Sequence, residues 1–132
     1  MAETHQGSCL CGAVHFEVSG PLRGVIFCHC SQCRKQTGHF FAATNVLTEN
    51  LTISGEDQVK WYAASPDALR GFCGTCGSAL FWKAKNYPYT AILAGAFDGA
   101  PGLVGLRHDF VANKGDYYQI TDGLPQNATF PA

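Results

Sequence analysis

Short segments that alternate hydrophobic and polar residues occur along most of the chain. In the clearest of them, 13–19, three apolar residues share one face, and His15 and Glu17 share the other. Successive side chains of a strand point to opposite faces of its sheet. The pattern therefore predicts a half-buried strand with His15 facing solvent.

Further strands are predicted where short apolar or β-branched segments are separated by Gly, Pro, Asn or Asp. They are 24–27, 39–44, 51–54, 59–64, 79–83, 89–95 and 105–110. The polar stretch 31–37 has no β-branched residue before its last position, and Ser31 is a candidate N-cap. We therefore expect a mainly β fold with one short helical segment. The aromatic residues expected in its core are Trp61, Phe72, Phe81 and Trp82.

The composition fits one globular domain. The chain has 132 residues, of which 46% are hydrophobic and only 14% charged. It contains no linker, internal repeat or low-complexity segment. We expect a single domain over residues 1–132.

The charge pattern and the apolar segments argue against two classes of partner. Nine Lys and Arg against ten Asp and Glu give a formal net charge of −1 without a basic run, which disfavours nonspecific nucleic-acid binding. The longest apolar stretch, 91–97, is too short to span a bilayer, and 1–7 lacks the features of a signal peptide. The prediction is a cytoplasmic protein whose low charge and aromatic residues are compatible with a homodimer.

Seven cysteines occur in clusters, and the spacing within each cluster is typical of metal ligands. The clusters are Cys9-x-Cys11, Cys28-x-Cys30-x-x-Cys33 and Cys73-x-x-Cys76. A disulfide framework is disfavoured, because the count is odd, the expected compartment is reducing and a chain of this length needs no crosslinks to fold. The pattern predicts zinc bound by thiolates.

Zinc chemistry divides the seven thiolates into four and three, because structural zinc takes four protein ligands and catalytic zinc three plus an exchangeable position. A glycine follows the second cysteine of both outer pairs and lets the backbone curl around a metal. We therefore assign a closed, structural zinc to one set of ligands, which are Cys9, Cys11, Cys73 and Cys76.

We assign the second zinc to the remaining cysteines, Cys28, Cys30 and Cys33, and expect its fourth position to be open or filled by water. A histidine is the alternative fourth ligand, and the candidates are His15, His29, His39 and His108. Of these His29 fits least well, because it lies between two ligands and its side chain should point away from a metal that they share.

Several residues near the middle cluster are candidates for lining a pocket. A zinc with three thiolates carries a net charge of about −1 and gains from nearby donors such as Arg34 and Lys35. His108 beside Asp109 is a candidate proton carrier. The pocket candidates are Gln32, Arg34, Thr37, Gly38 and His108. Each has a plainer interpretation as a solvated, turn or strand-face residue.

The motifs together resemble the glutathione-dependent formaldehyde-activating enzymes, a family that also includes the core of centromere protein V. The segments that carry the resemblance are GSCLCGAV (7–14), CHCSQCRKQTG (28–38), ASP (64–66), RGFCGTCGSAL (70–80) and DGLPQ (122–126). They cover nearly the whole chain in the expected order.

The resemblance implies a β-tent-like fold of packed antiparallel sheets held by zinc knuckles. It also implies a structural zinc on the outer cysteine pairs and a second zinc on the middle triplet. The family's activity is the joining of glutathione and formaldehyde into S-hydroxymethylglutathione, a carbon–sulfur lyase reaction in reverse. We therefore expect a zinc-dependent carbon–sulfur lyase that acts on thiol–aldehyde adducts, with Cys28, Cys30 and Cys33 at its catalytic centre. The alternatives are a noncatalytic zinc-binding interaction module and a thiol/zinc redox sensor.

Overall fold

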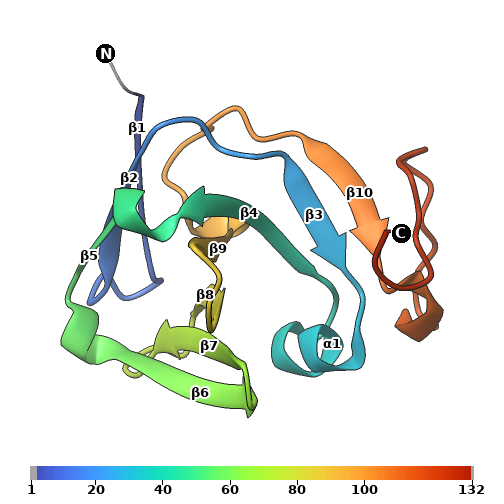
Figure 1. Ribbon diagram of the computed structural model, residues 1–132, viewed down its shortest axis with the longest axis horizontal. Coiled ribbons are helices and arrows are strands. Elements are labelled where there is room, and N and C mark those ends of the chain that lie inside the picture. The colour runs from blue at the N-terminus through green and yellow to red at the C-terminus, as the bar shows by residue number, and fades with distance from the viewer. Residues whose placement is uncertain (1–2, 132) are drawn as a thin grey trace.

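Two β-sheets and one short α-helix make up the computed structural model, which describes residues 3–131 (Figure 1). The helix is α1 (Ser31–Thr37). The strands are β1 (Thr4–Ser8), β2 (His15–Ser19), β3 (Val25–Cys28), β4 (Phe41–Leu47), β5 (Leu51–Ser54), β6 (Val59–Ser65), β7 (Ala68–Cys73), β8 (Ala79–Ala84), β9 (Tyr89–Leu93) and β10 (Gly105–Asp109).

The smaller sheet has the order β1-β2-β5, and the larger has the order β10-β3-β4-β9-β8-β7-β6. Neighbouring strands are antiparallel except for β10, which pairs parallel with β3. The larger sheet is strongly curved, and α1 lies near one end of it, after β3 and before β4 (Figure 1). The expected mainly β fold of packed sheets with one helix is confirmed.

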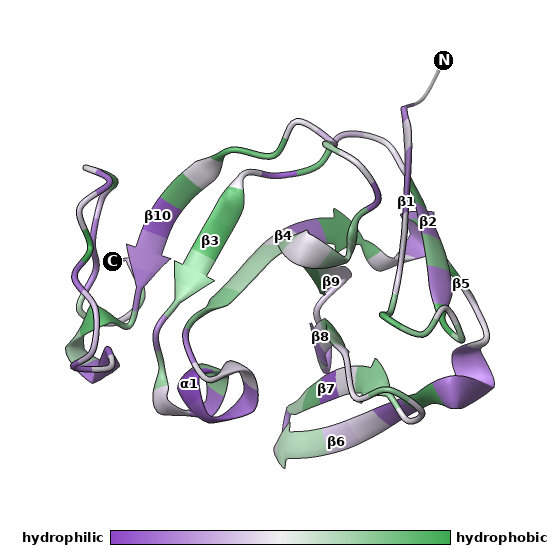
Figure 2. Ribbon diagram, turned by 180° about the vertical axis from the view of Figure 1, so that it is seen from behind, coloured by the Kyte–Doolittle hydropathy of each residue, from purple (hydrophilic) through white to green (hydrophobic). Residues whose placement is uncertain are grey.

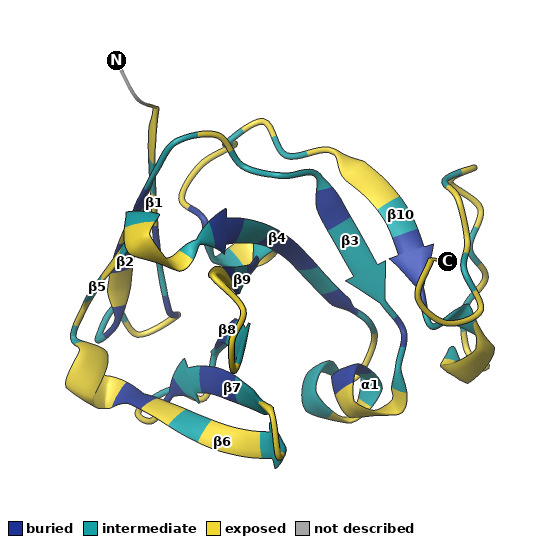
Figure 3. Cartoon of the chain, in the orientation of Figure 1, coloured by how far each residue is buried: buried dark blue, intermediate teal, exposed yellow. Residues whose placement is uncertain are grey.

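The main core lies between the two sheets. Phe16 and Val18 of β2 pack with Phe81 of β8 and Ile92 of β9, and all four are buried. Figure 3 shows further buried positions along β4 and β7. The rings of Phe16 and Phe81 meet edge to face, with centroids 5.7 Å apart. Full burial of one such side chain contributes about 1.5–3 kcal/mol, so this contact holds the sheets together.

The alternating pattern places most strands correctly. His15 is exposed at the start of β2, as predicted, and β5 coincides with the expected segment 51–54. Not all of the expected core residues are buried, however. Phe81 is fully buried, but Trp82 and Phe72 are only partly buried and line cavities.

Two strands lie outside the predicted segments. The polar sequence of β1 becomes a strand because it pairs along its whole length with β2. Gly7 permits close packing on both sides of β1, since a Cβ there would lie 2.3 Å from the carbonyl oxygen of Ala96 and 2.3 Å from the ring of Phe16 on β2. β7 contains Arg70 and Gly71 and forms between β6 and β8.

The helix α1 begins and ends with specific caps. Its N-cap is Cys30 and not Ser31, because the Cys30 Sγ accepts the backbone N–H of Cys33 at 3.3 Å. Gly38 ends the helix with φ 80°, a left-handed conformation that favours glycine. The residues of α1 are mostly hydrophilic (Figure 2). Among residues 3–131, no helix is long and apolar enough to cross a membrane.

Candidate metal centres

The first cluster joins the loop after β1 to the turn between β7 and β8. The sulfurs of Cys9, Cys11, Cys73 and Cys76 all lie within 4.8 Å of one another. The Sγ of Cys11 is 3.7 Å from that of Cys9 and 3.8 Å from that of Cys73. Four sulfurs placed tetrahedrally at the usual Zn–S distance are about 3.8 Å apart. The arrangement therefore fits a zinc ion, and the separations are too long for disulfides.

Backbone N–H groups point at the sulfurs of this cluster. Val14 donates to the Sγ of Cys9 at 3.3 Å, and Thr75 and Cys76 donate to that of Cys73 at 3.4 and 3.5 Å. The Ser78 hydroxyl lies 3.1 Å from the Cys76 Sγ and, with its backbone, lowers the Cys76 pKa to about 5. These contacts stabilise thiolates, the form in which cysteine binds a metal.

The second cluster lies where β3 meets α1. Cys28 ends β3, Cys30 is the helix N-cap, and Cys33 is in the first helical turn. Their sulfurs are also within 4.8 Å of one another, and this group could hold a metal ion. Cys30 is the N-cap, so the chain turns there from β3 into α1. This turn places the sulfurs of three cysteines from a six-residue segment close together.

Crowding of three thiols makes their protonation states interdependent. The pKa of Cys28 is raised by contact with Cys30, whereas that of Cys30 is lowered to about 2, chiefly by its contact with Cys28. A divalent ion favours the deprotonated form of all three sulfurs, so its binding is coupled to the release of protons.

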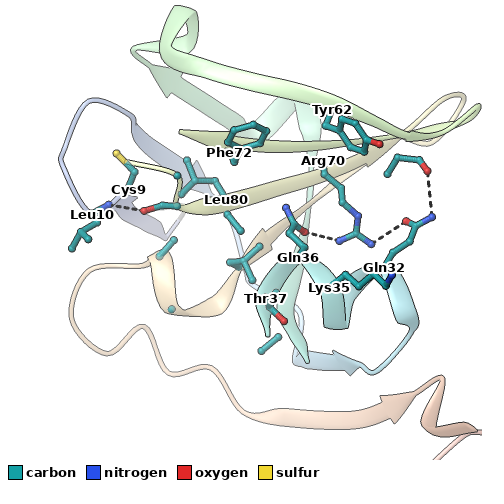
Figure 4. A pocket seen from close by; sticks show the side chains of 18 of the residues that line it. Cys9, Leu10, Gln32, Lys35, Gln36, Thr37, Tyr62, Arg70, Phe72 and Leu80 are labelled. Carbon is teal, nitrogen blue, oxygen red and sulfur yellow. Dashed lines mark hydrogen bonds between the residues drawn. The ribbon is translucent and has the colours of Figure 1, made fainter. Parts of the chain in front are cut away.

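Arg70 of β7 provides a positive charge at the second cluster. Its Nη2 donates to the Cys33 Sγ at 3.4 Å, and the residue is only 6% exposed. Gln36 and Gln32 on α1 accept from the guanidinium at 2.8 and 3.4 Å and fix its orientation (Figure 4). Arg70 opens the segment RGFCGTCGSAL that carries the family resemblance, but nothing in the spacing of the cysteines indicated that its side chain reaches Cys33.

None of the histidines in residues 3–131 joins the three-cysteine group. His29 is fully buried and points away from the sulfurs, with its Nδ1 bonded to the Tyr118 hydroxyl and its Nε2 2.8 Å from the His108 Nδ1. The His108 Nε2 in turn lies 2.8 Å from the Asp122 Oδ2. Burial and the neighbouring His108 lower the His29 pKa to about 4. The chain of bonds attaches the C-terminal segment to the cysteine loop.

A cavity of about 880 Å³ opens in front of the three cysteines. Its walls come from the face of the larger sheet on which Cys28 lies, and Gln32 of α1 closes one side. Lining residues that sequence reasoning missed are Arg23, Trp82 and Arg107. A second cavity, of about 1050 Å³, lies on the other side of Arg70 and extends toward Cys9 (Figure 4).

Only some of the residues that the sequence predicted to line a pocket do so in the structure. Gln32 lines both cavities, and Thr37 lines the larger one while its Oγ1 donates to the Cys33 carbonyl at 2.8 Å. Arg34 and Gly38 are absent from the lining of both, and Gly38 serves as the helix C-cap. His108 lies behind the sheet, on the face opposite to that of its neighbours Arg107 and Asp109.

The family model described as glutathione-dependent formaldehyde-activating enzyme matches residues 4–113. The chain belongs to this family. The match contains both cysteine clusters, together with Arg70 and the cavity face of the sheet, whereas Tyr118 and Asp122 lie beyond it.

Relatives support the assignment. A protein of Halomonas elongata named "Putative glutathione-dependent formaldehyde-activating enzyme" is 32% identical over 128 residues, which cover 87% of this chain and 80% of that protein. An uncharacterized lyase of Schizosaccharomyces pombe is 30% identical over 120 residues, covering 89% and 86%. A crystal structure of a Rhodobacter sphaeroides protein is similar with a TM-score of 0.61 and 26% identity, covering 76% of this chain and 97% of that one.

Proposed function

We propose that the chain is a zinc-dependent carbon–sulfur lyase that makes and breaks thiol–aldehyde adducts such as S-hydroxymethylglutathione. In the direction of adduct formation, the thiol sulfur bonds to the aldehyde carbon, and the thiol proton ends on the aldehyde oxygen. The reverse reaction breaks the same C–S bond and releases thiol and aldehyde. The names of the family and of the Halomonas relative support this substrate class.

One observation carries the proposal: the three-cysteine cluster faces a cavity, and no histidine or carboxylate in residues 3–131 completes its set of ligands. Three protein ligands and a free position are typical of zinc sites that bind a substrate. The four-cysteine cluster, in contrast, has a full set of ligands and suits a structural role. A zinc ion held by Cys28, Cys30 and Cys33 would keep a substrate thiol deprotonated near neutral pH.

The protein's own residues would hold the reactants in place. Arg70 balances the negative charge of the sulfurs through its bond to the Cys33 Sγ, and Gln36 keeps its guanidinium in position. Phe41 and Trp82 give the cavity wall an apolar and aromatic part against which the carbon skeleton of a substrate could pack. The cavity is large enough for a tripeptide-sized thiol.

The decisive experiment compares the native chain with Cys30→Ser. Serine is a preferred N-cap, so α1 and the fold should persist. The native chain should bind two zinc ions and accelerate the exchange of formaldehyde with glutathione, measured by NMR. The variant should keep one zinc ion and lose the acceleration.

Undiminished exchange by a folded Cys30→Ser variant with one zinc ion would remove the second metal from the mechanism. Two zinc ions in the native chain without any exchange would instead favour the interaction module. Release of zinc on reversible oxidation of the triplet would favour the redox sensor.

A further inference from the structure

The cavity in front of the three cysteines has a strongly cationic lining. Arg23, Arg70, Lys85 and Arg107 all contribute to it, whereas Asp109 is the one carboxylate among the lining residues in 3–131. Lys85 lies at the exposed rim. Arg70 is engaged with Cys33 and α1. The two remaining guanidinium groups have no role in the chemistry described above.

Arg23 reaches back along the sheet from the loop before β3. Its Nε donates to the carbonyl of Gly24 at 3.0 Å, and its Nη2 donates to the carbonyl of Ala43 at 3.1 Å. Ala43 of β4 pairs with Ile26, which precedes Cys28 by two residues on β3. The Arg23 guanidinium therefore lies about 7 Å along the strand from Cys28.

Arg107 approaches the same place from the opposite side of β3. It pairs with Ile26 across the parallel strands, and its Nε donates to Asp109, the partner of Cys28, at 3.1 Å. Asp109 is buried and also accepts from the Asn127 side chain at 3.1 Å. Asp109 thus forms an ion pair with Arg107, whereas Arg23 forms no ion pair with any of the described lining residues.

The two guanidinium groups are close enough to influence each other. Burial lowers the pKa of Arg23, and the positive charge of Arg107 acts in the same direction, whereas Tyr87 and Asp109 act in the opposite direction. Arginine nevertheless stays protonated in proteins. An anion bound between the two groups would relieve their repulsion, and the planar guanidinium matches a carboxylate in two parallel hydrogen bonds.

We propose that Arg23 and Arg107 form a carboxylate subsite that selects thiols carrying a carboxylate within about 10 Å of the sulfur. The inference rests on the proposed function, because it assumes that the substrate sulfur enters at the three cysteines. It makes the preferred substrate an anionic thiol and disfavours neutral thiols of the same size.

A binding measurement tests the subsite without requiring turnover. S-methylglutathione keeps both carboxylates of glutathione but has no thiol, and its affinity for the zinc-loaded chain can be measured by calorimetry. Arg23→Gln should weaken binding about tenfold or more, the scale of one lost charge-assisted hydrogen bond. Arg23→Lys should lose less, and Lys60→Gln, an exposed cation that lines neither cavity, should bind normally.

Turnover provides the second readout. In the NMR exchange assay, the ratio of kcat/KM for glutathione to that for 2-mercaptoethanol should fall about tenfold in Arg23→Gln. Equal affinities and equal ratios in Arg23→Gln, Lys60→Gln and the native chain would overturn the subsite while leaving the lyase proposal intact. Arg23-dependent binding of S-methylglutathione without exchange of any thiol would support the subsite and overturn the lyase. If Arg23→Gln does not fold, Arg23→Lys carries both comparisons.

Discussion

The buried charge of Arg70 should determine the affinity of the second metal site. Arg70→Met removes the guanidinium but keeps a long, unbranched apolar side chain. In the native chain, the Nη2 of Arg70 lies 3.4 Å from the Cys33 Sγ, and Arg70 is only 6% exposed. We therefore expect the change to weaken metal binding at Cys28, Cys30 and Cys33 and to leave the four-cysteine cluster unchanged.

The size of the effect follows from two estimates. Two unit charges 4 Å apart at an effective dielectric constant of 20 interact by about 4 kcal/mol, which is an upper bound. Hydrogen bonds to charged groups contribute about 1.5–3 kcal/mol when measured. A loss of about 2 kcal/mol corresponds to a roughly 30-fold weaker metal affinity.

Competition with a chromophoric zinc chelator measures the two sites separately, since they differ in ligand number. Arg70→Lys should lie between the native chain and Arg70→Met, because lysine keeps the charge but not the fork that also holds Gln36. Retention of one tightly bound zinc ion would show that the variants are folded. Native affinity at both sites in Arg70→Met would refute a role for this charge.

Two further predictions concern stability. Cys76→Ser should abolish metal binding by the four-cysteine cluster and, as a result, folding of the chain. A strong chelator should likewise lower the Tm of the native chain. If neither change alters the Tm, this cluster has no structural role. Gly7→Ala should destabilise the chain by about 1–3 kcal/mol in urea unfolding, because the new Cβ would lie 2.3 Å from the Ala96 carbonyl oxygen. Gly95→Ala, which meets nothing within 4 Å, is its matched control, and equal free energies of unfolding for the two variants would argue against the close packing of β1.

Local patterns in the sequence were sufficient for much of the fold. The alternation around Phe16 predicted β2 because one face of that strand is buried and the other solvated. The pattern failed for β1 and β7, whose residues are polar or mixed and become strands through their neighbours. Such pairing depends on partners far away in the chain and is invisible to a local pattern.

The cysteine spacing predicted the two clusters because ligands of one metal must be close in space, and the glycines after Cys11 and Cys76 marked the turns. Both glycines have positive φ, 83° at Gly12 and 81° at Gly77. The spacing could not show which side of β10 faces the cavity. His108 was the predicted proton carrier on this strand, but the strand alternation turns Arg107 and Asp109 toward the cavity instead.

The sharing of seven sulfurs between a complete and an incomplete set of metal ligands is the central claim, and anomalous diffraction at the zinc edge tests it most directly. Crystals of the chain as purified should show two peaks in each molecule. One should be surrounded by the four outer sulfurs, and the other by the sulfurs of Cys28, Cys30 and Cys33 plus a ligand that is not part of the protein. A disulfide within the triplet, or a protein side chain as its fourth ligand, would contradict the claim.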